Sequence, residues 1–302
     1  MKLAAADVRR LADLLAESLR LVAVDLEPLR VECAWPVFRA TSIGCRPMFV
    51  KVTDPAAAGR ALAFLSTAAE RPFLPRPILR EPLDFDGRAV LCTEWKEATR
   101  VNAEDMTDGQ FGAFLDGCRS LADALAAYRG PVAPLAEADS PRGEYSELNC
   151  YALRHPVAGR LLGPLLSIPE AERTYGDRRL VTIHGDLQPK NYGFDGDRFA
   201  AVFDTDDLTQ GLACEDAAYA FTERARRLEL PEDKRRRLHA LFRRMVELSP
   251  WPADEWRIAV SHARLRIAAR RLASHPDAAF IAFDIRRRDA PLRRLAEVAR
   301  AG

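Results

Sequence analysis

The sequence predicts an α+β fold with two lobes. Strand-like apolar segments fill its first third, whereas the chain after about residue 98 has mostly helical patterning. A length of 302 residues suits one large domain or two lobes with a substantial core. We therefore expect a small, largely antiparallel sheet with one helix in residues 25–95, followed by a helical lobe, with a cleft between them. Residues 94–97 form the predicted junction.

The predicted first lobe, residues 1–97, begins with an amphipathic helix over residues 5–23, in which acidic and arginine side chains are interspersed with apolar ones. Residues 29–53 are predicted to be extended, as two segments joined by a short turn at residues 42–44.

A second helix is predicted over residues 55–69. Asp54 is a suitable N-cap, and Pro55 fits the first helical position because it has no N–H to leave unsatisfied. Prolines keep the following segment LPRPILR extended. The segment GRAVLCTEW is an apolar run that ends in polar residues, which predicts a further strand.

The predicted second lobe, residues 98–302, opens with a long amphipathic helix for which Thr107 is a suitable N-cap. Residues 181–207 contain its only convincing strands. Residues 215–302 are helical in pattern apart from a Pro-rich break at residues 249–252. The chemistry of the chain is expected in the strand-containing segment.

Within that segment, NYGFDGDRFAAVF predicts a β-hairpin, because Asp-Gly at 195–196 lies between two apolar runs. The expected ladder pairs Asn191 with Ala200. Continued outward, it brings Asp204 next to Asp186. The side chains of Asp186, Asn191 and Asp204 should therefore lie close together in one small volume.

Crowded carboxylates raise one another's pKa unless a counter-charge is present. Mg²⁺ is a suitable counter-ion, because it prefers carboxylate and amide oxygens and usually keeps substrate phosphates as ligands. Asn191 and Asp204 suit that role, and Asp186 remains to accept a proton. An Asp, an Asn five residues later and a further metal-binding Asp match the template of phosphoryl-transfer enzymes. Such an enzyme also needs a Lys to bind phosphate. Lys51 lies in the predicted strand MFVKVT, where a buried Lys is costly unless it is paired.

These segments resemble those of small-molecule kinases related to aminoglycoside phosphotransferases and choline kinases. HGDLQPKN resembles their catalytic loop, AVFDTDD their metal-binding strand end, and CEDAAYAF the segment whose Asp ties down that loop. MFVKV is similar to their phosphate-lysine strand, and LCTEW to the strand that enters the adenine-binding hinge. The resemblance spans roughly residues 30–225 and is most specific in the catalytic segment.

The resemblance implies a two-lobed protein-kinase-like fold that uses ATP or GTP and Mg²⁺. It implies that Asp186 is the catalytic residue and that Asn191 and Asp204 bind the metal. His184 is expected to be structural, since Asp186 already fills the role of base. The remaining expected site residues are Lys51, Ser42, Glu94, Trp95 and Lys96 for the nucleotide, Asp216 to support the catalytic loop or cap a helix, and Asp206 and Asp207 for metal, substrate or solvent.

Two departures from the family pattern leave alternatives open. The helix after Lys51 has no Glu, and Glu70 just beyond it is the nearest candidate partner. The expected phosphate loop, ATSIGC, holds a single glycine, Gly44. A catalytically weak, kinase-like nucleotide-binding protein is therefore one alternative. A metal-dependent hydrolase that uses the same histidine and acidic residues is another, although it gives Lys51 no role.

The acceptor is expected to be a small molecule. Only residues 205–215 separate Asp204 from Asp216, too few for a peptide-docking activation segment, and the HGD motif lacks the Arg that senses activation-loop phosphate in protein kinases. The C-terminal helices are rich in Arg, which favours a neutral or anionic acceptor such as a sugar or glycan precursor, unless these side chains all face water. They are Arg264, Arg266, Arg270, Arg271, Arg286, Arg287 and Arg288.

Composition limits partners and location. A net charge of +1 provides no general field for nucleic acid. No apolar run approaches the roughly 18 residues that a membrane span needs. The six cysteines form no CxxC pair, and the N-terminus lacks signal-peptide character, so we expect a cytoplasmic protein without an integral membrane segment.

Overall fold

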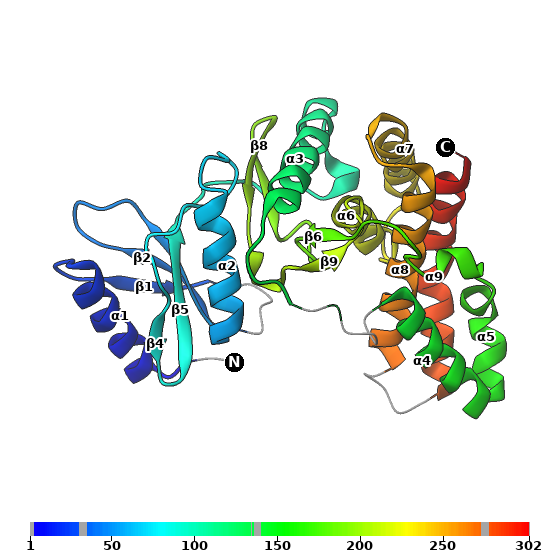
Figure 1. Ribbon diagram of the computed structural model, residues 1–302, viewed down its shortest axis with the longest axis horizontal. Helices are drawn as coiled ribbons and strands as arrows, with labels where there is room; N and C mark the ends of the chain where they lie inside the picture. Colours follow the sequence, from blue (N-terminus) through cyan, green and yellow to red (C-terminus); the bar gives the residue numbers. More distant parts are fainter. Residues whose placement is uncertain (1–2, 30–34, 134, 136–139, 273–277, 302) are drawn as a thin grey trace.

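The computed structural model describes residues 3–29, 35–133, 135, 140–272 and 278–301. It confirms the predicted α+β class: a small antiparallel sheet lies at one end of the molecule and most helices lie at the other (Figure 1). Among the described helices, none has the length and apolar character needed to cross a bilayer.

The sheet has five strands in the order β1-β2-β3-β5-β4, and every neighbouring pair is antiparallel. Helix α1 precedes it and helix α2 follows β3. The bounds are α1 Ala5–Leu19, β1 Asp25–Pro28, β2 Val37–Thr41, β3 Met48–Thr53, α2 Pro55–Thr67, β4 Leu83–Phe85 and β5 Arg88–Glu94.

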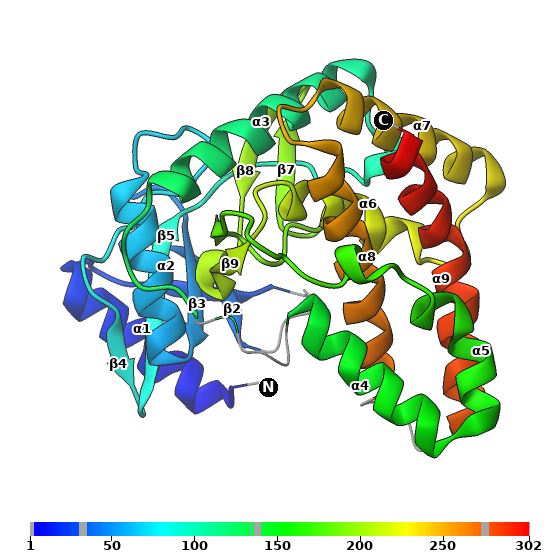
Figure 2. The same cartoon turned by 45° about the vertical axis from the view of Figure 1, so that its right-hand side comes forward.

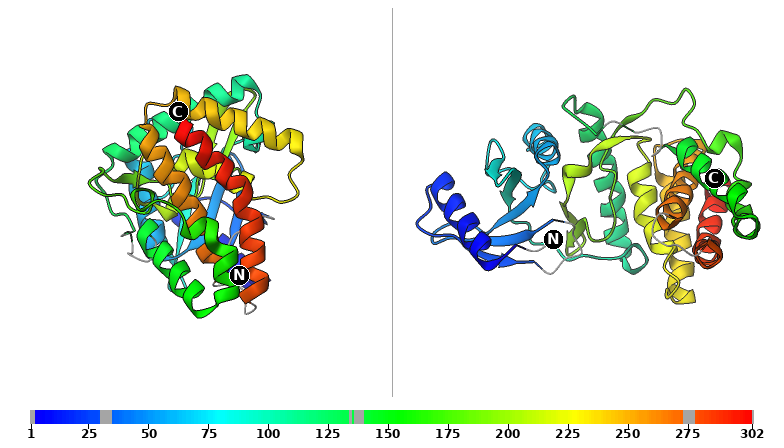
Figure 3. Two further views of the ribbon diagram at one scale, coloured as in Figure 1. Left: turned by 90° about the vertical axis from the view of Figure 1, so that its right-hand side faces the viewer. Right: turned by 90° about the horizontal axis from the view of Figure 1, so that it is seen from below.

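The two faces of the sheet have different partners. Successive side chains of a strand point to opposite faces. Val50 packs in the apolar cluster that contains Leu11 and Leu15 of α1. The neighbouring Lys51 pairs with Leu91 across β3 and β5, and Leu91 packs on α2. Seen from below, α1 and α2 accordingly lie on opposite sides of the sheet (Figure 3). Lys51 therefore faces the larger, helical part of the protein.

The first helix is shorter than the predicted 5–23. Arg20 adopts a left-handed conformation, with φ 55°, and its N–H bonds to the last turn of α1, which ends the helix at Leu19. Residues 25–28 instead form the edge strand β1, which the sequence analysis missed. Its sequence, DLEP, has one buried side chain, Leu26, so it lacks the alternation that marks a strand.

Of two further local features, one was predicted from the sequence and the other was missed. Helix α2 is confirmed, and the Asp54 side chain accepts hydrogen bonds from the N–H groups of Ala56 and Ala57 at 2.9 and 3.0 Å. The hairpin of β4 and β5 was missed. Its turn is an Asp-Gly pair at 86–87 with positive φ at both residues, the same signal that was recognised at 195–196.

The helical part begins with a capping box at Thr107, as predicted for this helix. A break between α7 and α8 falls at the Pro-rich segment, also as predicted. Figure 2 shows α8 and α9 side by side, with α4 and α5 on their outer side. The bounds are η1 Ala103–Asp105, α3 Asp108–Ala127, α4 Pro141–Arg154, α5 Pro156–Leu166, η3 Glu170–Glu172, β6 Val181–Ile183, β7 Tyr192–Asp195, β8 Arg198–Val202, η4 Thr205–Asp207, β9 Thr209–Gly211, α6 Glu215–Ala225, α7 Glu232–Leu248, α8 Ala253–Leu272 and α9 Ala278–Ala301.

The hairpin of β7 and β8 forms, but the predicted register is wrong. Asp195 pairs with Arg198, so the two turn residues are 196–197 rather than 195–196, and a bulge at residues 193–194 shifts the ladder further. Asn191 therefore bonds to Phe203, not Ala200: its carbonyl oxygen accepts the Phe203 N–H at 2.8 Å. This register still sets Asn191 beside the start of the acidic turn.

Candidate active site

Two cavities adjoin the loop at residues 184–191. Cavity A, of about 590 Å³, lies between the sheet and this loop, and Lys51, Asn191 and Asp204 are among its lining residues. Cavity B, of about 880 Å³, lies on the helical side, and Asp186 and Asp207 line it. Lys190 lines both. The loop therefore places the acidic group of Asp186 on the cavity B side and the amide of Asn191 on the cavity A side.

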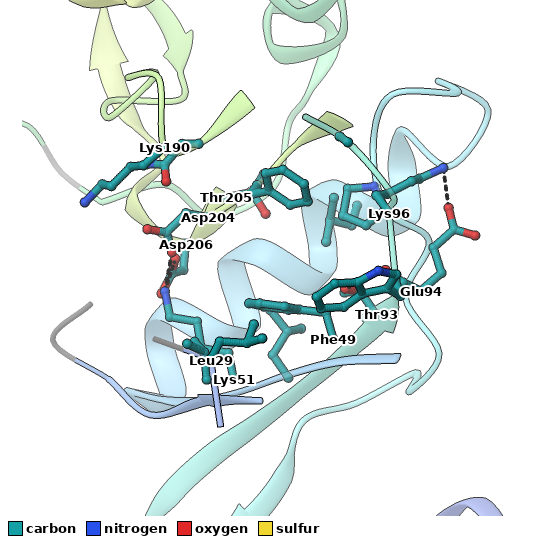
Figure 4. Close-up of a pocket in the computed structure, with 18 of the residues that line it drawn as sticks. Leu29, Phe49, Lys51, Thr93, Glu94, Lys96, Lys190, Asp204, Thr205 and Asp206 are labelled. Atoms are coloured by element: carbon teal, nitrogen blue, oxygen red, sulfur yellow. Dashed lines mark hydrogen bonds and ion pairs between the residues drawn. The ribbon is translucent and has the colours of Figure 1, made fainter. Parts of the chain in front are cut away.

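Lys51 makes the strongest charge contacts in cavity A. Its Nζ bonds to the two carboxylate oxygens of Asp206 at 2.8 and 2.7 Å and also contacts Asp204. Figure 4 shows the ammonium group pointing from the sheet at these two acids on the opposite wall. Lys51 and Asp206 are 4% and 5% exposed, so the pair is shielded from solvent.

The balance of charge in this cluster fixes protonation states. Burial alone would lower the pKa of Lys51, but the Asp204 and Asp206 carboxylates raise it above its usual value. Burial opposes ionisation of Asp204 as well, yet the adjacent Lys51 charge holds the pKa of that carboxyl below its usual value. Lys51 is therefore a buried cation at neutral pH, suited to contact an anion.

Asp204 also has an uncommon backbone. Its φ is 63°, in the left-handed region, where η4 begins directly after β8. Asn and Asp tolerate this region better than other residues with a side chain, because their short polar groups bond locally. The sharp turn is what aims both Asp204 and Asp206 back towards the sheet.

The loop at residues 184–191 is held by Asp216, in the first turn of α6. Its two carboxylate oxygens accept the N–H groups of His184 at 2.7 Å and Gly185 at 2.9 Å. Gly185 has φ +82°, and a Cβ there would lie 2.8 Å from the Asp207 carbonyl oxygen, so only glycine fits. The loop conformation thus depends on one buried acid and one glycine.

Replacing Asp216 with Asn should loosen this loop. The amide offers one acceptor where two N–H groups need one each, and its own NH₂ would face a donor. We expect the free energy of unfolding to fall by about 1.5–3 kcal/mol, the usual value for a hydrogen bond to a charged group, and turnover to fall with it. Urea unfolding measures the first effect. Asp233→Asn, which changes an exposed acid in the first turn of α7, is the matched control and should change stability little.

Within the loop, His184 is buried and its Nε2 lies 2.8 Å from the Phe203 carbonyl oxygen. Asp186 is oriented by two amides: Gln188 Nε2 bonds to both carboxylate oxygens at 2.7 and 2.8 Å, and Asn191 Nδ2 bonds to one at 2.8 Å. The Asp186 carboxylate is therefore fixed in direction while it faces cavity B. Gln188 was not singled out from the sequence, because a Gln in a polar loop carries no distinguishing pattern.

The donor atoms around cavity A fit Mg²⁺. Asn191 uses its NH₂ group on Asp186, which leaves its amide oxygen as the atom for a cation, and Asp204 supplies a carboxylate on the same cavity. Both are hard oxygen ligands, as Mg²⁺ prefers. Among the described residues, no three His, Cys, Asp or Glu side chains are arranged to hold a metal by themselves. A magnesium ion here would need further oxygen ligands from a substrate.

The far end of cavity A is formed by the segment after β5. Glu94, Trp95 and Lys96 all line it, as the sequence analysis expected for a base-binding segment. The N–H groups of Glu94 and Trp95 bond to the carbonyl oxygens of Arg76 and Pro47 at 2.8 and 3.1 Å. Lys96 N–H has no backbone partner among the described residues.

Ser42 does not belong with these residues. It is absent from the described lining of cavity A and lies in the β2–β3 turn, at the opposite end of those strands from the Lys51–Val37 pair. Because β1 was missed, the turn before β3 was taken for the loop over the cavity. Leu29 and Val37, which flank the β1–β2 connection, line cavity A; residues 30–34 between them lie outside the described part.

Comparison with known proteins agrees with this geometry. Residues 25–251 match the model of the phosphotransferase enzyme family. The sequence has no significant match among curated proteins. Solved structures with a similar fold include a thermostable aminoglycoside phosphotransferase APH(4)-Ia in ternary complex with ADP and hygromycin B, at 16% identity, covering 94% of this chain and 98% of that chain, with a TM-score of 0.62.

Two further structures are similar. The amicoumacin kinase hAmiN, in complex with AMP-PNP, Ca²⁺ and its ligand Ami, matches at 12% identity over 88% of this chain and 87% of that chain, with a TM-score of 0.59. The macrolide 2′-phosphotransferase MphH from Brachybacterium faecium matches at 16% identity over 96% and 98%, with a TM-score of 0.55. These likenesses establish the protein-kinase-like fold, and the family match covers most of the chain. The chain belongs to the phosphotransferase enzyme family and is a small-molecule phosphotransferase.

Proposed function

We propose that the protein transfers the γ-phosphoryl group of ATP or GTP to a hydroxyl of a sugar-type small molecule. The observation that carries this proposal is the position of the loop at residues 184–191 between cavities A and B. A nucleotide in cavity A and an acceptor in cavity B would meet where Asp186 and Asn191 face each other across the loop. Residues 1–97 then form the nucleotide-binding lobe and residues 98–302 the catalytic and acceptor-binding lobe.

On the donor side, we assign the base to the segment Glu94–Lys96, with the Lys96 N–H as donor because the two preceding N–H groups are bonded. Lys51 contacts the phosphates. Asn191 and Asp204 would hold Mg²⁺, which would supply positive charge against the phosphates. The proposal includes either ATP or GTP as the phosphoryl donor. Competition between ATP and GTP for the same binding site tests which of them binds.

On the acceptor side, Asp186 orients the attacking hydroxyl and takes its proton late in the reaction. Its carboxylate faces cavity B and is held there by the amides of Gln188 and Asn191. His184 and Asp216 keep the loop in shape without contacting substrate.

Cavity B is lined by six Lys or Arg and five Asp or Glu side chains, and one of the cations, Arg270, supports an acceptor with an acidic group. Most of its cations are committed: Arg224 pairs with Glu104, Arg226 and Arg227 pair with Glu223, and Arg266 lies 3.7 Å from Glu144. Arg270 also lines the cavity, is exposed, and has no carboxylate within ion-pair distance in the part of the chain that the structure describes. We assign Arg270 to an anionic substituent of the acceptor. Of the seven arginines considered from the sequence, Arg266 and Arg270 are in the described lining of cavity B, and Arg264, Arg271, Arg286, Arg287 and Arg288 are not.

Arg270→Gln should therefore raise KM for an acidic acceptor without changing nucleotide affinity. Loss of one charge-assisted hydrogen bond corresponds to a rise of roughly 10- to 100-fold. Steady-state kinetics on an acidic sugar and its neutral analogue measures the effect, which should be confined to the acidic one. Arg286→Gln removes the same charge from an exposed position outside the cavity and should have no effect.

A screen of hydroxylated metabolites for nucleotide consumption tests the whole proposal. Neutral and acidic sugars, amino sugars and amino alcohols form its panels, each run with ATP and GTP and with and without Mg²⁺. Mg²⁺-dependent phosphorylation of an acidic sugar is the expected result. Preference for a polycationic acceptor would contradict the assignment of Arg270 while leaving the phosphotransferase activity in place.

A further inference from the structure

We infer that Asp206 is the residue that positions Lys51 for phosphate contact, in place of the helix Glu that fills this role in protein kinases. The inference rests on the proposed function, since it assigns a role to Lys51 in nucleotide binding. It is built on the contacts of η4 with α2 and β3.

Helix α2 has no acid to offer. Its buried face consists of alanine, leucine and phenylalanine side chains, and the Lys51-facing side of the sheet meets Ala61 and Leu62 there. Glu70, the only nearby alternative in the sequence, is exposed and lines a separate surface hollow with Arg71 and Phe73. A buried lysine without a partner is strongly disfavoured, so the counter-charge has to come from elsewhere.

The η4 turn occupies that place. It packs directly against α2, whose small alanine side chains leave room for it. Both carboxylate oxygens of Asp206 accept hydrogen bonds from Lys51 Nζ, and Thr53 Oγ1 donates a further hydrogen bond to its Oδ2 at 3.2 Å. Arg60 of α2 bonds to the Asp206 carbonyl oxygen at 3.3 Å. Asp206 is thus fixed by the neighbouring helix and strand, while remaining bonded to the ammonium group.

This arrangement separates the tasks of two neighbouring acids. Both acids line cavity A, and the Asp204 side chain, 23% exposed, is the more open of the two and is placed to bind a metal. The Asp206 side chain is 7% exposed and lies behind it against Thr53 and Lys51. When Asp204 engages a cation, the pair with Asp206 keeps Lys51 in position. The missing helix Glu therefore gives no reason to expect a protein without turnover.

Two double-mutant cycles test the inference. The first measures urea unfolding of the metal-free, nucleotide-free protein for Lys51→Met, Asp206→Asn and the double variant. The second measures the Kd of an ATP analogue with Mg²⁺ for the same set. We expect a coupling of at least about tenfold in both the unfolding constant and Kd, so that Asp206→Asn adds little once Lys51 is gone. The control cycle pairs Lys51→Met with Glu70→Gln instead of Asp206→Asn. The effects of these two substitutions should be additive, both on the free energy of unfolding and on the Kd of the nucleotide.

The outcomes are distinct. If Asp206 bound the metal directly, its loss would weaken nucleotide binding equally with and without Lys51, and additive effects on Kd would overturn the inference. If the wild-type protein bound no nucleotide, the proposed function would fail, and the unfolding cycle alone would decide the Lys51–Asp206 pairing. Thr53→Val serves as the milder variant should Asp206→Asn not fold: it removes one bond to Asp206 and should weaken nucleotide binding in the same direction by a smaller factor.

Discussion

Asp186→Asn should lower turnover by about 10²- to 10⁴-fold, the range typical for loss of a general base. The amide has the same shape but cannot take the proton of the acceptor hydroxyl. Nucleotide affinity should change little, because Asp186 faces cavity B and the groups proposed to bind the phosphates line cavity A. Single-turnover kinetics together with nucleotide titration separates the two quantities.

The matched control for this variant is Asp195→Asn. Asp195 lies at the exposed end of β7, close to the catalytic loop in sequence, and forms a surface pair with Arg198. It makes the same change of charge without touching either cavity, so turnover should stay near the wild-type value. Near-full turnover of Asp186→Asn on the true acceptor would disprove the mechanism while leaving the family assignment intact.

Asp204→Asn should have a different signature, because it affects binding as well as chemistry. Removal of an outer-shell partner of a metal site weakens metal binding by roughly 10- to 100-fold. Loss of the Asp204 carboxylate, a direct ligand, should weaken Mg²⁺ binding by at least as much. Nucleotide affinity in Mg²⁺ and turnover should both fall. The thermal stabilisation that nucleotide gives in Mg²⁺ should shrink, since a bound ligand stabilises according to its concentration relative to Kd.

The comparison with and without the metal makes this prediction specific. In EDTA, the wild-type protein and Asp204→Asn should bind nucleotide about equally weakly, because the difference between them arises from Mg²⁺. A difference of the same size in EDTA would mean that Asp204 acts only through Lys51, which it contacts directly. Asp186→Asn should retain the metal-dependent stabilisation in full.

The sequence was most informative where residues close in the chain act together. The segment from His184 to Asp207 folds largely on itself, so its motif spacing already predicted a compact site. The hairpin register was wrong because a bulge and a glycine turn shift the ladder by amounts that alternation does not encode. Asn191 nevertheless bonds to Asp186 and shares cavity A with Asp204, since both registers join the same two strands.

Long-range partners were less predictable. Lys51 and Asp206 are separated by 155 positions, and nothing in either local pattern indicates the other. Helix α2 gave a misleading cue, because its missing Glu pointed to a weakened site rather than to an acid supplied by another element. The edge strand β1 escaped detection because a short edge strand needs only one buried side chain, and this error then misplaced the loop at Ser42.

The left-handed backbone at Asp204 limits which mutations this position can accept. A residue there has to tolerate φ 63° and also supply an oxygen of the correct charge. Asparagine meets the first demand alone, glycine meets it without a side chain, and glutamate meets the second demand with a poorer backbone fit. Each substitution therefore loses either the fit to the left-handed backbone or the negative charge, so no other amino acid can replace Asp204 without an effect. In a saturation library, variants at this position should separate into folded but inactive proteins, led by Asn, and proteins that have lost stability as well, led by β-branched residues.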